Sequence, residues 1–119
     1  MKVVLTGTSA YGPAKEDSDI DIVVTHKTAM EIWGCVGAWA LYAYQTEAQE
    51  AYEPFGGFYF DLGPLKINVI DAGDEENQEK WAEATEKMKA LPPIEDRAER
   101  VRTFRSFFGL GDPTEEGQL

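Results

Sequence analysis

Two aspartates, Asp19 and Asp21, stand two residues apart in a run of alternating polar and β-branched residues. Successive side chains of a strand point to opposite faces of a sheet, so a strand over residues 19–24 places both carboxylates on one face. Two like charges this close repel each other unless a cation lies between them. Carboxylate oxygens are hard ligands that suit Mg²⁺. The alternation therefore predicts a sheet that carries a magnesium site at Asp19 and Asp21.

A second polar feature, Gly7-Thr8, directly follows a short apolar run over residues 3–5. This run predicts a buried strand that ends in a turn, and the residues from Ser9 to Gly12 have the length of one helical turn. Backbone amides and a hydroxyl at such a turn suit the phosphates of a nucleoside triphosphate. A bound magnesium ion bridges phosphate oxygens in the same arrangement. The candidate nucleotide-binding residues are Gly7, Thr8, Ser9, Asp19 and Asp21.

The rest of the chain predicts helices and two further strands. Apolar residues recur at three- and four-residue intervals from Thr28 to about Tyr52, as in a long amphipathic helix. Two short apolar runs, 58–62 and 65–70, flank Gly63-Pro64 and predict a β-hairpin. Helical spacing returns after the acidic segment 71–76 as far as Leu91, and again from about Glu95 to Phe108.

Counting across the hairpin pairs Asp61 with Lys66 and Tyr59 with Asn68, all on one face of the sheet. Asp61 then lies one diagonal step from Asn68 and is a candidate metal ligand. The alternative that we favour for Asp61 is a salt bridge to Lys66.

The composition predicts one domain and a cytoplasmic protein. With 119 residues the chain can bury one core, which we expect within residues 1–108, followed by a flexible tail over 109–119. The net charge of −11 repels nucleic acid and anionic lipid, so we expect neither general nucleic-acid binding nor membrane binding. The single cysteine, Cys35, lies in an apolar stretch, which fits the core of a protein in a reducing compartment.

The segment from Gly7 to Ile22 resembles the signature of minimal nucleotidyltransferases of the polymerase-beta superfamily. That signature is Gly-Ser, a helical turn near a second Gly, a short loop, and Asp-Ser-Asp-hydrophobic-Asp-hydrophobic. The chain matches it without insertion, with Thr8 in the place of Ser. The resemblance implies an α+β fold, with a mixed sheet of about four strands packed against helices. It also implies nucleotide contact by Gly7 and Thr8 and metal coordination by Asp19 and Asp21.

The chain departs from this family at three positions. Ser9 and Tyr11 stand where many minimal members carry Arg. The family also uses a third carboxylate on a later strand, and the strand that matches it here carries Asn68 in that place. An amide oxygen brings neither charge nor useful basicity at neutral pH.

We therefore expect a Mg²⁺-dependent nucleotidyltransferase that moves a nucleoside monophosphate from a nucleoside triphosphate to a hydroxyl of a protein, an RNA end or a small molecule. Its candidate catalytic residues are Asp19, Asp21 and Asn68. The alternative is a catalytically impaired binding or regulatory module with an antitoxin-like protein partner. The C-terminal part resembles small nucleotidyltransferase-like proteins of phages, which implies the host cytoplasm. Arginines of the last helix, at positions 97, 100, 102 and 105, are candidates for phosphate contact or for pairing with nearby Glu.

Overall fold

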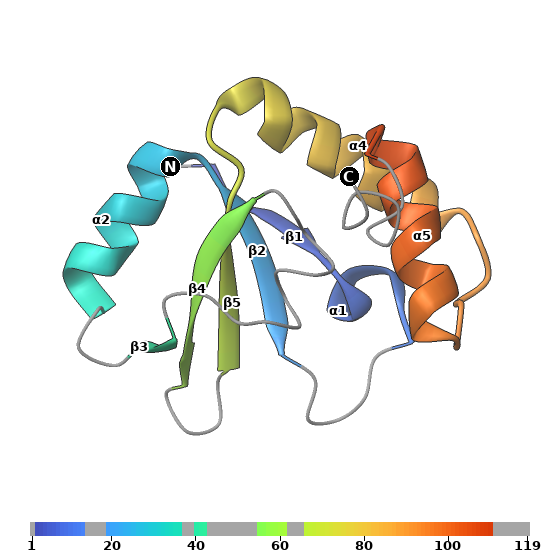
Figure 1. Ribbon diagram of the computed structural model, residues 1–119, viewed down its shortest axis with the longest axis horizontal. Helices are drawn as coiled ribbons and strands as arrows, with labels where there is room; N and C mark the ends of the chain where they lie inside the picture. The colour runs from blue at the N-terminus through green and yellow to red at the C-terminus, as the bar shows by residue number, and fades with distance from the viewer. Residues whose placement is uncertain (1, 14–18, 37–39, 43–54, 62–65, 111–119) are drawn as a thin grey trace, which may run out of the picture.

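The computed structural model describes residues 2–13, 19–36, 40–42, 55–61 and 66–110. These residues form an α+β fold in which helices cover both faces of a five-stranded mixed sheet (Figure 1). The helices are α1 (Thr8–Tyr11), α2 (His26–Val36), α4 (Glu75–Lys89) and α5 (Arg97–Phe108), and the strands are β1 (Val4–Thr6), β2 (Ile20–Val24), β3 (Ala40–Tyr42), β4 (Gly56–Asp61) and β5 (Lys66–Asp71).

The strand order is β1-β2-β5-β4-β3. Strands β2 and β5 run parallel, and the other neighbouring pairs run antiparallel. The predicted α+β class and mixed sheet are confirmed, and the described residues contain one strand more than the four expected. The candidate residues of β2 and β5 therefore lie side by side in the middle of the sheet.

Alternation along β2 gives the sheet two buried faces. Val23 packs in the cluster under α4 and α5, whereas Val24 packs in the cluster under α2. Both valines have no exposed surface. A strand covered on both faces is rich in apolar residues, which explains why β2 is polar only near its start.

The larger cluster is built around Trp81 of α4, which has no exposed surface. Its ring lies 5.1 Å from that of Phe55, 5.6 Å from Phe104 and 5.1 Å from Phe108, measured between ring centroids. These aromatic contacts join α4 to α5 and to the start of β4. They fix α5 against the same face of the sheet as α4.

Both C-terminal helices begin and end at residues suited to those places. Asp74 caps α4 by accepting the N–H of Asn77 at 2.8 Å, and Asp96 caps α5 by accepting the N–H of Glu99 at 3.1 Å. Gly109 follows α5 in the left-handed conformation, at φ 99°. The predicted end of the last helix at Phe108 is therefore confirmed.

The single long helix predicted from Thr28 to about Tyr52 is wrong. Helix α2 ends at Val36, and residues 40–42 form strand β3, which pairs antiparallel with β4. Pairing with β4 at the sheet edge provides hydrogen-bond partners for the backbone of residues 40–42. Gly34 also lowers the stability of a helix that would continue through this region. The segment 43–52 of the predicted helix lies outside the described residues.

The start of α2 also differs from the prediction, because the helix begins at His26. The Thr25 hydroxyl accepts the N–H of Thr28 at 3.4 Å, so Thr25 caps the start of the helix. Cys35, predicted in the core, is exposed on α2.

The hairpin register is confirmed where it is described. Asp61 pairs with Lys66 and Tyr59 pairs with Asn68, as the count across Gly63-Pro64 required. Residues 62–65, which include the predicted turn, and residues 111–119 of the predicted tail lie outside the described residues.

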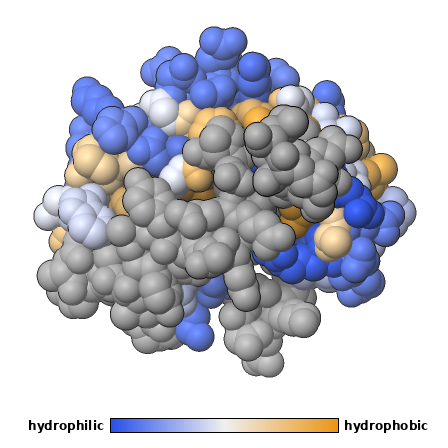
Figure 2. All heavy atoms as spheres, viewed as in Figure 1, coloured by the Kyte–Doolittle hydropathy of each residue, from blue (hydrophilic) through white to orange (hydrophobic). Residues whose placement is uncertain are grey.

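Hydrophilic side chains cover the solvent face of α4, along the top of the molecule in Figure 2. Exposed acidic and basic residues alternate there, as the exposed Glu79, Lys80, Glu83 and Lys87 illustrate. None of the helices in the described part of the chain is long and apolar enough to cross a membrane.

The aromatic core predicts unequal effects for two tryptophan substitutions. Trp81→Ala removes a fully buried ring and should lower the free energy of unfolding by about 3–5 kcal/mol. Trp33→Ala is the matched control, because Trp33 is 39% exposed on α2, and it should cost on the order of 1 kcal/mol. Urea unfolding of both variants measures the difference, and an equal loss would contradict this core.

Candidate nucleotide- and metal-binding site

A row of polar side chains crosses four strands of the sheet on the face covered by α4 and α5. Thr6 of β1 pairs with Asp21 of β2, Asp21 pairs with Asn68 of β5, and Asn68 pairs with Tyr59 of β4. Paired residues of neighbouring strands point to the same face. The fold therefore brings Asp21 and Asn68 together, although 47 positions separate them in sequence.

The Asp21 carboxylate is buried, with 8% of the residue exposed. Its Oδ1 accepts a hydrogen bond of 2.9 Å from Nδ2 of Asn68. An amide that donates to a carboxylate stabilises the charged form of that carboxylate, as a cation does. Asn68 therefore stabilises the charge of Asp21 at Oδ1, whereas a carboxylate in the place of Asn68 would repel it.

Gly7 lies against the other side of the same carboxylate. Its backbone has φ 73° and ψ −169°, a conformation that is essentially restricted to glycine. A Cβ atom at Gly7 would overlap Oδ2 of Asp21 and lie 2.9 Å from its Cγ. Only glycine allows the turn after β1 to approach the carboxylate so closely.

The turn continues directly into α1. The Gly7 carbonyl accepts the N–H groups of Ala10 at 2.9 Å and Tyr11 at 3.1 Å. The amides of Thr8 and Ser9 in the first turn have no acceptor within the helix. Ser9 is exposed, and its hydroxyl donates to the Thr6 carbonyl at 3.4 Å. The predicted nucleotide-binding segment thus presents polar groups beside Asp21.

Helix α4 holds the end of β1 in place. The hydroxyls of Thr6 and Thr85 share a buried hydrogen bond of 2.8 Å, and the Thr85 hydroxyl also contacts the Trp81 carbonyl at 2.8 Å. Because Gly7 follows Thr6, this bond fixes the starting point of the turn. The sequence analysis did not identify this pair, since Thr6 and Thr85 are 79 positions apart.

Tyr11 lies at the end of α1 with its ring stacked on Phe104 of α5, at 6.3 Å between centroids and 16° between planes. Burial raises the pKa of Tyr11 to about 12, and the nearby Asp21 carboxylate adds to the rise, whereas Arg100 opposes it. The phenol therefore keeps its proton at neutral pH. It lies within electrostatic reach of both Asp21 and Arg100.

The structure describes the other two predicted metal ligands, Asp19 and Asp61, in less detail. Asp19 is half-buried and precedes β2, two residues before Asp21. The backbone of Asp61 pairs with Lys66 at the end of β4, while its side chain lies outside the described part. Within the described ranges, no three His, Cys, Asp or Glu side chains group together as a metal site.

This donor set fits Mg²⁺ bound together with phosphate groups. Magnesium in proteins is commonly held by one or two carboxylates, with substrate phosphates and water completing its six ligands. Asp19 and Asp21 would supply the carboxylates, and the Gly7 turn lies against Asp21.

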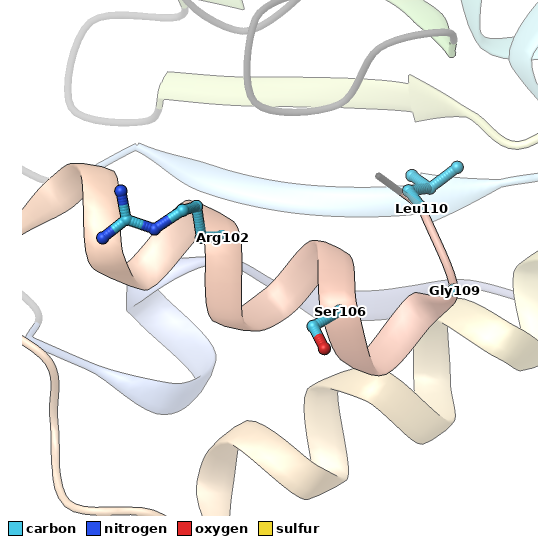
Figure 3. Close-up of a pocket in the computed structure, with 4 residues that line it drawn as sticks. All are labelled: Arg102, Ser106, Gly109 and Leu110. Atoms are coloured by element: carbon cyan, nitrogen blue, oxygen red, sulfur yellow. The ribbon is translucent and has the colours of Figure 1, made fainter. Parts of the chain in front are cut away.

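A separate pocket of about 490 Å³ lies along α5 and includes none of the predicted nucleotide- or metal-binding residues from Gly7 to Asn68. Arg102, Ser106, Gly109 and Leu110 line it (Figure 3). It is therefore distinct from the polar row around Asp21.

Comparison with protein families agrees with this geometry. The family model of the nucleotidyltransferase domain matches residues 1–96, which include the candidate nucleotide- and metal-binding residues from Gly7 to Asn68. No curated protein and no solved structure matches the chain significantly. The chain belongs to the nucleotidyltransferase domain family, and its resemblance to minimal members of the polymerase-beta superfamily is confirmed. Such domains generally use a divalent metal ion and a nucleoside triphosphate.

The contact between Gly7 and Asp21 predicts the effect of adding one methyl group. Gly7→Ala places a Cβ in the carboxylate, whereas Gly73→Ala adds a Cβ at a similar φ, 86°, with nothing within 4 Å. Gly7→Ala should therefore lower the free energy of unfolding by about 1–3 kcal/mol more than Gly73→Ala. Urea unfolding measures both losses, and equal values would contradict the close approach of the turn to Asp21.

Proposed function

We propose that this domain is a Mg²⁺-dependent nucleotidyltransferase that moves a nucleoside monophosphate from a nucleoside triphosphate to a hydroxyl acceptor. The observation that carries the proposal is the contact of the Gly7 turn with the Asp21 carboxylate. A phosphate-binding turn and a metal-binding carboxylate must meet if one metal ion is to bridge protein and triphosphate.

Each residue has a distinct role in this proposal. Gly7, Thr8 and Ser9 bind the phosphates through amides and hydroxyls, while Asp19 and Asp21 hold Mg²⁺. The ion, when bound, neutralises negative charge that builds up at the reacting phosphorus. Asn68 orients Asp21 through its 2.9 Å hydrogen bond, and Asp61 is the proposed additional carboxylate.

The proposed acceptor is a hydroxyl on a protein or a small molecule in the cytoplasm, which is the host cytoplasm if a phage encodes the chain. The net charge of −11 disfavours a nucleic acid as a general partner. A protein partner with a basic surface matches this charge better.

A second candidate function is a regulatory module that binds nucleotide without efficient transfer. The Asn68–Asp21 hydrogen bond favours it, because Asn68 cannot accept the proton of an attacking hydroxyl. Nucleotide binding and transfer therefore have to be measured separately.

Substitution of Asn68 tests which function applies. Asn68→Asp restores a third carboxylate beside Asp21, so transfer from an α-labelled triphosphate should rise at least about tenfold, as expected for a general base. Mg²⁺ should also raise the melting temperature of N68D more than that of the wild type, because the ion relieves the repulsion of two adjacent carboxylates.

Two controls accompany this measurement. Asp21→Ala should abolish transfer in both the wild-type and N68D backgrounds, and labelling that survived would exclude the proposed site. Asn77→Asp makes the same chemical change on α4, outside the polar row, and should leave transfer unchanged. Saturable binding of triphosphate and Mg²⁺ by the wild type, without any transfer, would assign the chain to the regulatory function.

A further inference from the structure

The nucleotide-binding turn provides no positive charge of its own. Helix α1 consists of Thr, Ser, Ala and Tyr, and the chain as a whole carries a net charge of −11. A triphosphate that binds beside Asp21 meets a negative field that one Mg²⁺ ion offsets only in part. A cation from another element is needed near the turn.

Helix α5 reaches α1 through an aromatic contact, while α4 also packs against α1. Helix α5 begins at Arg97, directly after the residues 1–96 that match the family model, so the match itself assigns no role to it. Phe104 of α5 stacks on Tyr11 of α1 at 6.3 Å. In Figure 1, α1 lies beside the first turns of α5.

Only one arginine of α5 suits a contact at the turn. Arg97 and Arg105 already interact with other groups, and Arg105 has no exposed surface. Arg102 lines the separate pocket with Ser106 (Figure 3). Arg100 precedes Phe104 by four residues and thus shares the helix face that meets Tyr11.

The Arg100 side chain is held in place yet keeps donors for a ligand. Its Nη1 donates to the Ile94 carbonyl at 2.9 Å and the Glu95 carbonyl at 3.3 Å. A guanidinium group has five N–H donors. Within the described part of the chain, Nε and Nη2 of Arg100 have no acceptor, and the residue is half-buried. The group is fixed at one end and available at the other.

We propose that Arg100 binds the polyphosphate chain of the nucleoside triphosphate at the Gly7-Thr8 turn. This assignment rests on the proposed function of the site. The planar guanidinium offers paired N–H groups that match two phosphate oxygens. Arg100 and Asp21 both act electrostatically on the Tyr11 side chain, so the cation and the proposed metal-binding carboxylate lie near the same residue of α1.

The test compares triphosphate, diphosphate and monophosphate binding by isothermal titration with Mg²⁺. Arg100→Gln should weaken triphosphate binding by about 10- to 100-fold, as expected for charge-assisted hydrogen bonds, with little change for the monophosphate. Arg100→Lys should lose less, because it keeps the charge. Arg102→Gln, two residues away on the same helix, should bind as the wild type does.

The outcomes separate this inference from the proposed function. Absence of triphosphate binding by the wild type would refute the proposed function itself. Binding by the wild type together with an unchanged triphosphate-to-monophosphate affinity ratio in R100Q would overturn the role of Arg100 alone. An equal loss in R102Q would also overturn it, because the effect would then be one of general charge.

Arg100→Gln also removes two hydrogen bonds that support the start of α5. A second measurement therefore uses the wild-type protein alone, in which these bonds are intact. Phenylglyoxal modifies accessible arginines of the wild-type protein, and mass spectrometry locates the modified positions. Bound triphosphate and Mg²⁺ should protect Arg100 but not Arg102. Equal modification of Arg100 with and without the triphosphate would overturn the proposal.

Discussion

The site depends on the Asp21 carboxylate, which Gly7 meets on one side and Asn68 on the other. A buried carboxylate is costly unless hydrogen bonds or a cation stabilise its charge. The Asn68 amide supplies one such bond, and the Gly7 turn, which has no side chain, lies against the second oxygen. The neighbouring strands, the turn and α1 are therefore arranged around one negative charge.

The same contacts decide what chemistry the domain can perform. In the proposed function Asp19, Asp21 and the Gly7-Thr8 turn hold Mg²⁺ and a triphosphate with the help of Arg100, whereas removal of the acceptor's proton usually relies on a third carboxylate. Asn68 keeps the geometry of that third position without its basicity. The proposed site therefore favours binding over fast transfer, and in our proposal Arg100 of α5 brings the cation that α1 lacks.

The local pattern of the sequence predicted most of the fold and the centre of the site. The strand with Asp21 and the hairpin count to Asn68 depend on neighbouring residues and were confirmed, although the strand begins at Ile20 and Asp19 precedes it. The long helix after Thr28 failed because pairing of residues 40–42 at the sheet edge outweighed apolar spacing. The bond of Thr6 to Thr85 and the approach of α5 to Tyr11 join distant segments, and no local pattern encodes them.

The most direct test is a crystal structure of the protein with Mg²⁺ and a non-hydrolysable triphosphate. The account predicts the ion on the carboxylates of Asp19 and Asp21, and the phosphates against the amides of the Gly7-Thr8 turn. It would be contradicted by an ion bound elsewhere, or by a triphosphate that lies away from this turn while the polar row remains intact.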